Sequence, residues 1–231
     1  MATLVVALGA TVQRTLGFGA ALVSVPLLVL INPRFVPGPF TIAGLAGLAL
    51  MVWGTHRETD WRGVRWMVLG ILPGTVVAGV ALATLPQDAL SLAAGVLILG
   101  AVAAIVARRH PRVGRRSLLG AGALSGFMGT TAGVAGPPIA LLYHREEGAV
   151  IRATLARMFL VSAALTLIAL GGAHRLGTAD WAAGVAMMPG GPIGVVAGRR
   201  VATRVNAGHL RIGVLVVSTL SALAVVARVV L

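Results

Sequence analysis

Two stretches of this 231-residue chain place polar residues, glycine and proline inside otherwise apolar runs. The first covers residues 13–26 and opens Gln-Arg-Thr-Leu-Gly-Phe-Gly, and the second covers residues 125–138, opens Ser-Gly-Phe-Met-Gly-Thr-Thr and closes Pro-Pro. Glycine and proline are poor residues for a helix interior, so each stretch predicts a broken helix. At such a break, the free N–H groups and positive dipole end of the following helix form a site for a small oxyanion.

The side chains that could complete this site are amides, hydroxyls and one guanidinium group. Amides and hydroxyls add hydrogen bonds to an anion, and arginine adds a fixed charge. We expect the second half-helices to begin near Gly19 and Thr131, so that the two breaks meet near the middle of the membrane. The predicted substrate-binding residues are Gln13, Arg14, Gly17, Gly19, Ser125, Gly129, Thr130, Thr131 and Gly133.

A purely structural interpretation of these residues stays open. The glycines could serve only close helix packing, and the hydroxyls could bond across helices. Arg14 could extend to the membrane surface or pair with a carbonyl group instead of touching substrate. Pro137 and Pro138 fit the first turn of the second half-helix, where proline is favoured.

The composition identifies an integral membrane protein. The chain is 58% hydrophobic and 11% charged, with a mean hydropathy of +0.95. Its formal charge of +13 comes from 19 arginines and no lysine. Because these arginines cluster in short loops, they indicate membrane orientation rather than nucleic-acid binding.

Enzyme, metal and cofactor chemistry have little support in the sequence. The chain has no cysteine, which excludes disulfides and thiolate metal sites. Its five histidines are scattered over loops without the spacing of metal ligands. All six acidic residues lie in loops or at span ends, so the predicted spans carry no carboxylate for a proton relay or a coupling cation.

The two halves of the chain resemble each other. Gly17 and Pro26 recur as Gly129 and Pro138 at a spacing of 112 residues. We therefore predict an all-α integral membrane protein with two inverted repeats, each a broken re-entrant helix hairpin plus three transmembrane helices. The first repeat is residues 1–110, with hairpin 2–31 and spans 39–54, 64–85 and 89–107. The second is residues 117–231, with hairpin 118–143 and spans 149–171, 181–198 and 209–229.

Arginine placement decides how the hairpins enter the membrane. If residues 118–143 crossed the membrane fully, the arginines at 108–116 and 199–211 would lie on opposite sides. If this segment instead enters and returns on one side, both clusters are cytoplasmic, together with 15 of the 19 arginines. The positive-inside rule favours the second arrangement. Segment 2–31 then enters from outside, and three crossings per half invert the second repeat.

An ordered set of motifs resembles the TauE/SafE sulfite-exporter (TSUP) family of membrane anion transporters. Residues 13–19 lead to Val-Pro-Leu-Leu at 25–28, and residues 125–138 lead to Arg-Ala-Thr-Leu at 152–155. The resemblance covers essentially the whole chain. It implies a multi-pass protein of the bacterial inner membrane that moves sulfite, organosulfonates or related small anions. Family members often carry glycine where this chain has Arg14.

We predict that the protein exports a small sulfur-containing anion, of the sulfite or organosulfonate class, by alternating access driven by the membrane potential. The expected partners are this anion and the lipid bilayer, with no nucleic acid; a homodimer is compatible with the pattern. A passive small-anion channel of the same architecture and a non-transport membrane assembly partner are the alternatives. We expect no cofactor and no metal site.

The arginine pattern predicts that residues 108–116, 144–148 and 199–209 share the cytoplasmic side. Because the chain has no cysteine, single cysteines at positions 114 and 204 can be probed with an impermeant thiol reagent. Both should be modified from the cytoplasmic face. Modification of the two positions from opposite faces would contradict the hairpin topology.

Overall fold

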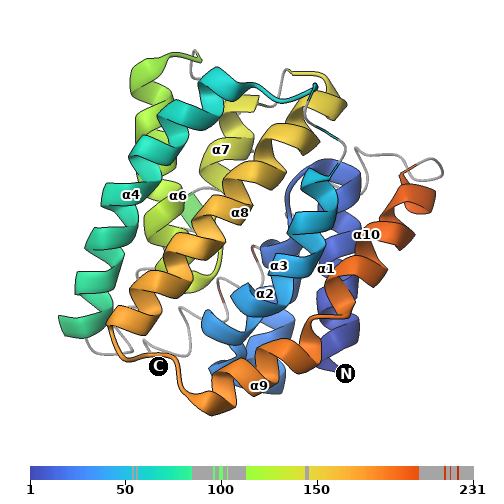
Figure 1. Ribbon diagram of the computed structural model, residues 1–231, viewed down its shortest axis with the longest axis vertical. Coiled ribbons are helices and arrows are strands. Elements are labelled where there is room, and N and C mark those ends of the chain that lie inside the picture. Colours follow the sequence, from blue (N-terminus) through green and yellow to red (C-terminus); the bar gives the residue numbers. More distant parts are fainter. Residues whose placement is uncertain are drawn as a thin grey trace.

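The computed structural model describes residues 1–53, 55, 57–84, 96, 99–100, 103, 113–143, 146–202, 216, 219 and 223. This part of the chain is helical and contains no strand (Figure 1). Three helical stretches in it are long and apolar enough to cross a membrane, Trp61–Thr84, Gly148–Gly172 and Thr178–Val201. The prediction of an all-α protein with membrane-spanning helices is therefore confirmed. The predicted spans 89–107 and 209–229 lie almost wholly outside the described residues.

The helices fall into two series along the chain. The first is α1 (Ala2–Leu16), α2 (Ala20–Ile31), the 3-10 helix η1 (Pro33–Phe35), α3 (Gly38–Val52) and α4 (Trp61–Thr84). The second is α6 (Arg115–Ala132), α7 (Gly136–Tyr143), α8 (Gly148–Gly172), α9 (Thr178–Met187) and α10 (Gly190–Val201). The predicted span 181–198 is thus divided between α9 and α10, because Pro189 cannot donate the backbone bond that would continue α9.

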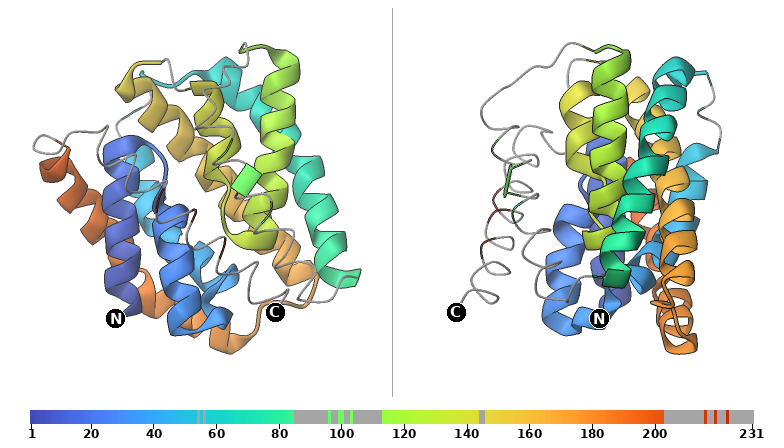
Figure 2. Two further views of the ribbon diagram at one scale, coloured as in Figure 1. Left: turned by 180° about the vertical axis from the view of Figure 1, so that it is seen from behind. Right: turned by 90° about the vertical axis from the view of Figure 1, so that its left-hand side faces the viewer.

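The bundle has two sides joined by a central pair of helices (Figures 1 and 2). On one side α1 packs along α10, and on the other α4 packs along α6. The central pair is α3 and α8, which contact each other. They run antiparallel, since Arg157 in the first half of α8 donates to the carbonyl of Val52 at the end of α3, at 3.3 Å.

Both predicted helix breaks are present, and glycine makes them. Gly17 ends α1 with φ 87°, Gly19 precedes α2 with φ 106°, and Gly133 ends α6 with φ 72°. This left-handed backbone is unfavourable for residues with a Cβ. The residues that end the two first half-helices, Gly17 and Gly133, lie 116 positions apart. The sequence pairing of Gly17 with Gly129 is therefore displaced by one helical turn.

The start of the second half-helix also differs from the prediction. Thr131 lies in the last turn of α6, where its hydroxyl donates to the carbonyl of Phe127 at 2.8 Å. The new helix begins at Gly136 instead. Pro137 and Pro138 occupy its first turn, as predicted, because the first residues of a helix need no N–H donor.

Each pair of half-helices folds back on itself. The Ser24 hydroxyl on α2 donates to the carbonyl of Val5 on α1 at 3.0 Å, so α2 returns toward the start of α1. Arg115, at the start of α6, lies 4.1 Å from the ring centroid of Trp66. Tyr143, at the end of α7, donates to Asp60 beside the start of α4 at 2.6 Å. Both ends of the second pair thus lie at the same end of α4.

Asp60 anchors that end of the bundle. Its Oδ1 accepts the Gly63 N–H at 2.9 Å, so it caps the start of α4. Its own N–H donates to the Thr154 hydroxyl on α8 at 3.0 Å. Together with the Tyr143 bond, these contacts tie α4, α7 and α8 together through one loop residue.

Glycine contacts allow the outer helices to pack closely. A Cβ added at Gly70 or Gly74 on α4 would clash with the carbonyls of Leu119 or Ala123 on α6. On the other side, Gly190 and Gly194 of α10 meet the carbonyls of Thr3 and Ala7 on α1 in the same way. Along each pair the contact residues advance together, so the two helices of a pair run parallel. Small residues permit this close backbone approach between membrane helices.

Candidate functional site

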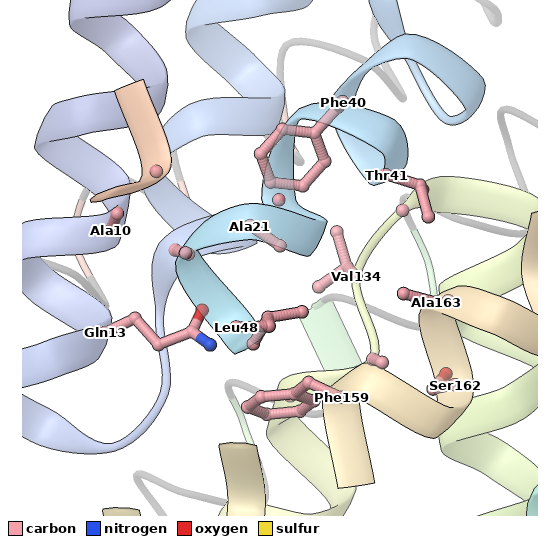
Figure 3. A pocket seen from close by; sticks show the side chains of 18 of the residues that line it. Ala10, Gln13, Ala21, Phe40, Thr41, Leu48, Val134, Phe159, Ser162 and Ala163 are labelled. Carbon is pink, nitrogen blue, oxygen red and sulfur yellow. The ribbon is translucent and has the colours of Figure 1, made fainter. Parts of the chain in front are cut away.

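A cavity of about 110 Å³ lies between the two helix breaks. Its wall is formed by one face each of α1, α3 and α8, the first turn of α2, the α6–α7 linker and two positions on α10 (Figure 3). Gly19 from the first break and Gly133 from the second both line it. Residues more than 100 positions apart in the sequence thus enclose one space.

The start of α2 opens into this cavity. Gly19, Ala20, Ala21 and Leu22 all line it. The first bonded N–H of this turn is that of Val23, which donates to the Gly19 carbonyl at 3.2 Å. The N–H groups before Val23 have no acceptor within a helix and carry the positive end of the helix dipole.

The start of α7 is a weaker donor. Gly136 lines the cavity, but the next two residues are Pro137 and Pro138, which have no N–H. The sequence interpretation gave the two half-helices equal roles. The structure places more hydrogen-bond donors at the α2 end.

Two side chains add polar groups without internal partners. Gln13 on α1 is 8% exposed and directs its amide toward the cavity, as Figure 3 shows. Ser162 on α8 is 3% exposed and also lines the cavity. Neither side chain has a hydrogen-bond partner within the described part of the chain, and the polar atoms of both remain accessible. An accessible amide or hydroxyl without an internal partner can hydrogen-bond a polar ligand in the cavity.

The predicted site residues divide into two groups. Gln13, Gly19, Gly129 and Gly133 line the cavity. The other five do not, and they lie as follows.

The three predicted hydroxyl groups are all engaged inside the protein. Ser125 donates to the carbonyl of Ala135. The Thr130 hydroxyl pairs with that of Thr166 at 3.0 Å, and Thr131 bonds within its own helix. None of the three lines the cavity, but Thr166 does, so Thr130 is connected to the cavity through its bond to Thr166.

Arg14 and Gly17 face outward from the cavity, toward other helices. A Cβ added at Gly198 on α10 would lie 2.7 Å from the Cβ of Arg14. A Cβ at Gly17 would lie 2.7 Å from Ile151 and 3.5 Å from Arg152, both at the start of α8. The cavity wall, as far as the structure describes it, contains no charged side chain.

The sequence analysis missed the contribution of α3 and α8. Phe40, Gly44 and Gly47 on α3 line the cavity, and so do Phe159, Ala163 and Thr166 on α8. A signal for them was available, because Phe40 recurs as Phe159 at a spacing of 119 residues, and Gly44 and Gly47 fall on Ala163 and Thr166 at the same spacing. Neither helix has a break, so neither drew attention as a binding segment.

The chain is similar to known membrane exporters. The family described as Sulfite exporter TauE/SafE matches residues 2–225. A curated relative, the probable sulfite/organosulfonate exporter TauE of Cupriavidus necator, is 29% identical over 167 residues. That alignment covers 67% of this chain and 64% of the relative, so the match spans less than two thirds of the relative's length. No solved structure matches the chain.

The geometry predicts that Gln13, rather than Thr131, contacts the transported anion. Gln13→Leu should raise the KM for flux about tenfold, because one hydrogen bond to a charged group is worth about 1.5 kcal/mol or more. Thr131→Val should leave KM close to wild type, since that hydroxyl bonds its own helix. Flux into proteoliposomes measures both. If Thr131→Val raised KM more than Gln13→Leu does, the anion would not bind in this cavity.

Proposed function

The chain belongs to the TauE/SafE sulfite exporter family, a family of membrane exporters rather than enzymes, and we propose that it exports a small sulfur-containing anion through the cavity between its helix breaks. The substrate is of the sulfite or organosulfonate class, in keeping with the family description and with the printed name of the relative. The membrane is the bacterial inner membrane, which the chain crosses several times.

One observation carries this proposal. The cavity combines the free N–H groups of α2 with the unpartnered Gln13 and Ser162 side chains, and its described wall carries no carboxylate that would repel an anion. Helix N-termini and neutral donors bind small oxyanions without a strong counter-charge. Weak, neutral binding also lets the anion leave, which a transporter requires.

Two inverted repeats account for the helix contacts. The contact of Gly74 with Ala123 has a counterpart in that of Gly194 with Ala7. The glycines of these two contacts lie 120 residues apart, and the alanines lie 116 apart. In both cases the first half-helix of one repeat packs on the second span of the other. The antiparallel course of α3 and α8 agrees with inversion, so we assign residues 1–110 and 117–231 to the two repeats.

Inverted repeats around a central site support alternating access, in which the two halves rock about the cavity. A passive anion channel with the same helices is the competing function. Saturable flux with counterflow, measured with sulfite and with an organosulfonate, indicates a carrier. Flux that rises linearly with concentration indicates a channel.

The membrane potential is sufficient to drive this export. An interior-negative potential favours anion exit by roughly 2.3 kcal/mol per charge per 100 mV. The described cavity wall offers no acidic residue to bind a coupling proton. The mechanism therefore needs no coupling ion.

Export should be electrogenic. Collapsing the potential with valinomycin and high external potassium should slow efflux of a strong-acid sulfonate, whereas a pH gradient imposed at zero potential should change it little. A sulfonate is chosen because, unlike sulfite, it stays ionised over the accessible pH range. Proton coupling through Asp60 or Asp180 is the competing mechanism. Efflux that follows the pH gradient and ignores the potential would establish it.

A further inference from the structure

Two phenylalanines occupy equivalent places in the cavity wall. Phe40 on α3 and Phe159 on α8 both line the cavity and lie 119 residues apart. The small residues one turn further on, Gly44 and Ala163, have the same spacing and also line it. Phe40 and Phe159 are the only aromatic residues in the described wall of the cavity.

The two rings lie at opposite ends of the cavity (Figure 3). Because α3 and α8 are antiparallel, Phe159 lies toward the end of the bundle where Arg157 meets Val52. Phe40 lies toward the other end, two residues from Gly38, where an added Cβ would lie 3.9 Å from Leu170. This registration separates the two positions by about nine residues, or roughly 14 Å at 1.5 Å per residue.

Both rings touch the α6–α7 linker. The Phe40 ring lies 3.7 Å from a Cβ placed at Gly133, and the Phe159 ring lies 3.6 Å from one placed at Gly136. The two rings therefore flank Val134 and Ala135 from either side. Both phenylalanines are half-buried and pack against the edge of the hydrophobic core. A small movement of the linker would change the packing of both rings.

We propose that Phe159 and Phe40 are the two gates of the transport path. Phe159 closes the cavity toward the end of the bundle where α4 and α8 begin, which is the predicted cytoplasmic end, and Phe40 closes it toward the opposite end. This rests on the alternating-access export proposed above. An apolar ring at a constriction excludes the hydration water that an anion carries, so it blocks passage without binding the anion. A ring can also change rotamer without breaking a hydrogen bond, which keeps the two closed states close in energy.

A single reporter cysteine tests this assignment. Gly44 lines the cavity, and a Cβ there would meet no atom within 4 Å, so Gly44→Cys fits without displacing neighbours. In the cysteine-free chain, its modification by an impermeant thiol reagent can be followed from each face of oriented vesicles. Phe159→Ala should make modification several-fold faster from the cytoplasmic face only. Phe40→Ala should make it several-fold faster from the opposite face only.

Matched variants control for general loosening. Phe127→Ala removes a ring from α6 that does not line the cavity, and it should leave the labelling rates from both faces unchanged. Phe159→Leu and Phe40→Leu keep an apolar side chain and should give smaller effects with the same sidedness. These leucine variants carry the test if an alanine variant fails to insert.

Sidedness decides the outcome. If either alanine variant accelerates labelling equally from both faces, or from neither face in a folded protein, the gates are not these rings. Sulfonate flux is measured in parallel with both phenylalanines in place. If this protein transports sulfonate but the labelling results contradict the gates, the gate proposal is wrong and the proposed export function is unaffected. Replacing both phenylalanines with alanine should convert saturable flux to a linear leak, and saturable flux in that double variant would overturn the proposal.

Discussion

A helix that breaks inside an apolar bundle must find partners for its backbone N–H and C=O groups, and the rest of this structure depends on how that is done. In hydrocarbon, each unpaired group costs several kcal/mol. At both breaks, a glycine with left-handed backbone ends the first half-helix, and its N–H group bonds a carbonyl in the last turn of that helix. The Gly17 N–H bonds the Gln13 carbonyl at 2.7 Å, and the Gly133 N–H bonds the Gly129 carbonyl at 3.0 Å. Ser125 then pairs with the Ala135 carbonyl in the second linker. Within the described part of the chain, the N–H groups at the start of α2 have no such partner, and their residues line the cavity.

The same constraint explains the close packing around the breaks. A bundle that holds two interrupted helices loses contact area at each interruption, and the glycine contacts of α4 with α6 and of α10 with α1 compensate for it. A methyl group at Gly74 would force these backbones apart, and overpacking of this kind costs about 1–3 kcal/mol. The neutral cavity is a further consequence. Arg14 follows Gln13 in the sequence, yet it points to α10, so its fixed positive charge is kept out of the cavity.

Much of this architecture could be predicted from the sequence, because glycine and proline mark backbone geometry directly. The two breaks and the role of Pro137 and Pro138 both follow from residue type. The direction in which a side chain points was less accessible. Successive residues of a helix are rotated by about 100°. Aligning the two breaks at a spacing of 112 residues instead of 116 therefore assigns a different set of side chains to the cavity. That displacement paired Gly129 with Gly17. Thr131 and Ser125 were selected as anion donors because their hydroxyls suit that role, but internal carbonyls already accept them.

Phe40, Phe159 and Ser162 were missed for a different reason. They lie on uninterrupted helices without a glycine or proline break to mark them, and the 119-residue spacing of Phe40 and Phe159 does not by itself show which way the rings face. The account therefore depends on the claim that these faces and the two breaks enclose one anion site.

The most direct measurement is substrate protection of a cysteine at position 162. In the Ser162→Cys variant, an organosulfonate should slow modification of the thiol, with half-protection at the concentration that half-saturates export by the same variant. A cysteine at Gly114, an exposed loop position outside the cavity, should react at a rate that does not depend on the sulfonate. If the Ser162→Cys protein exports the sulfonate while its thiol reacts at an unchanged rate, the anion does not pass through this cavity.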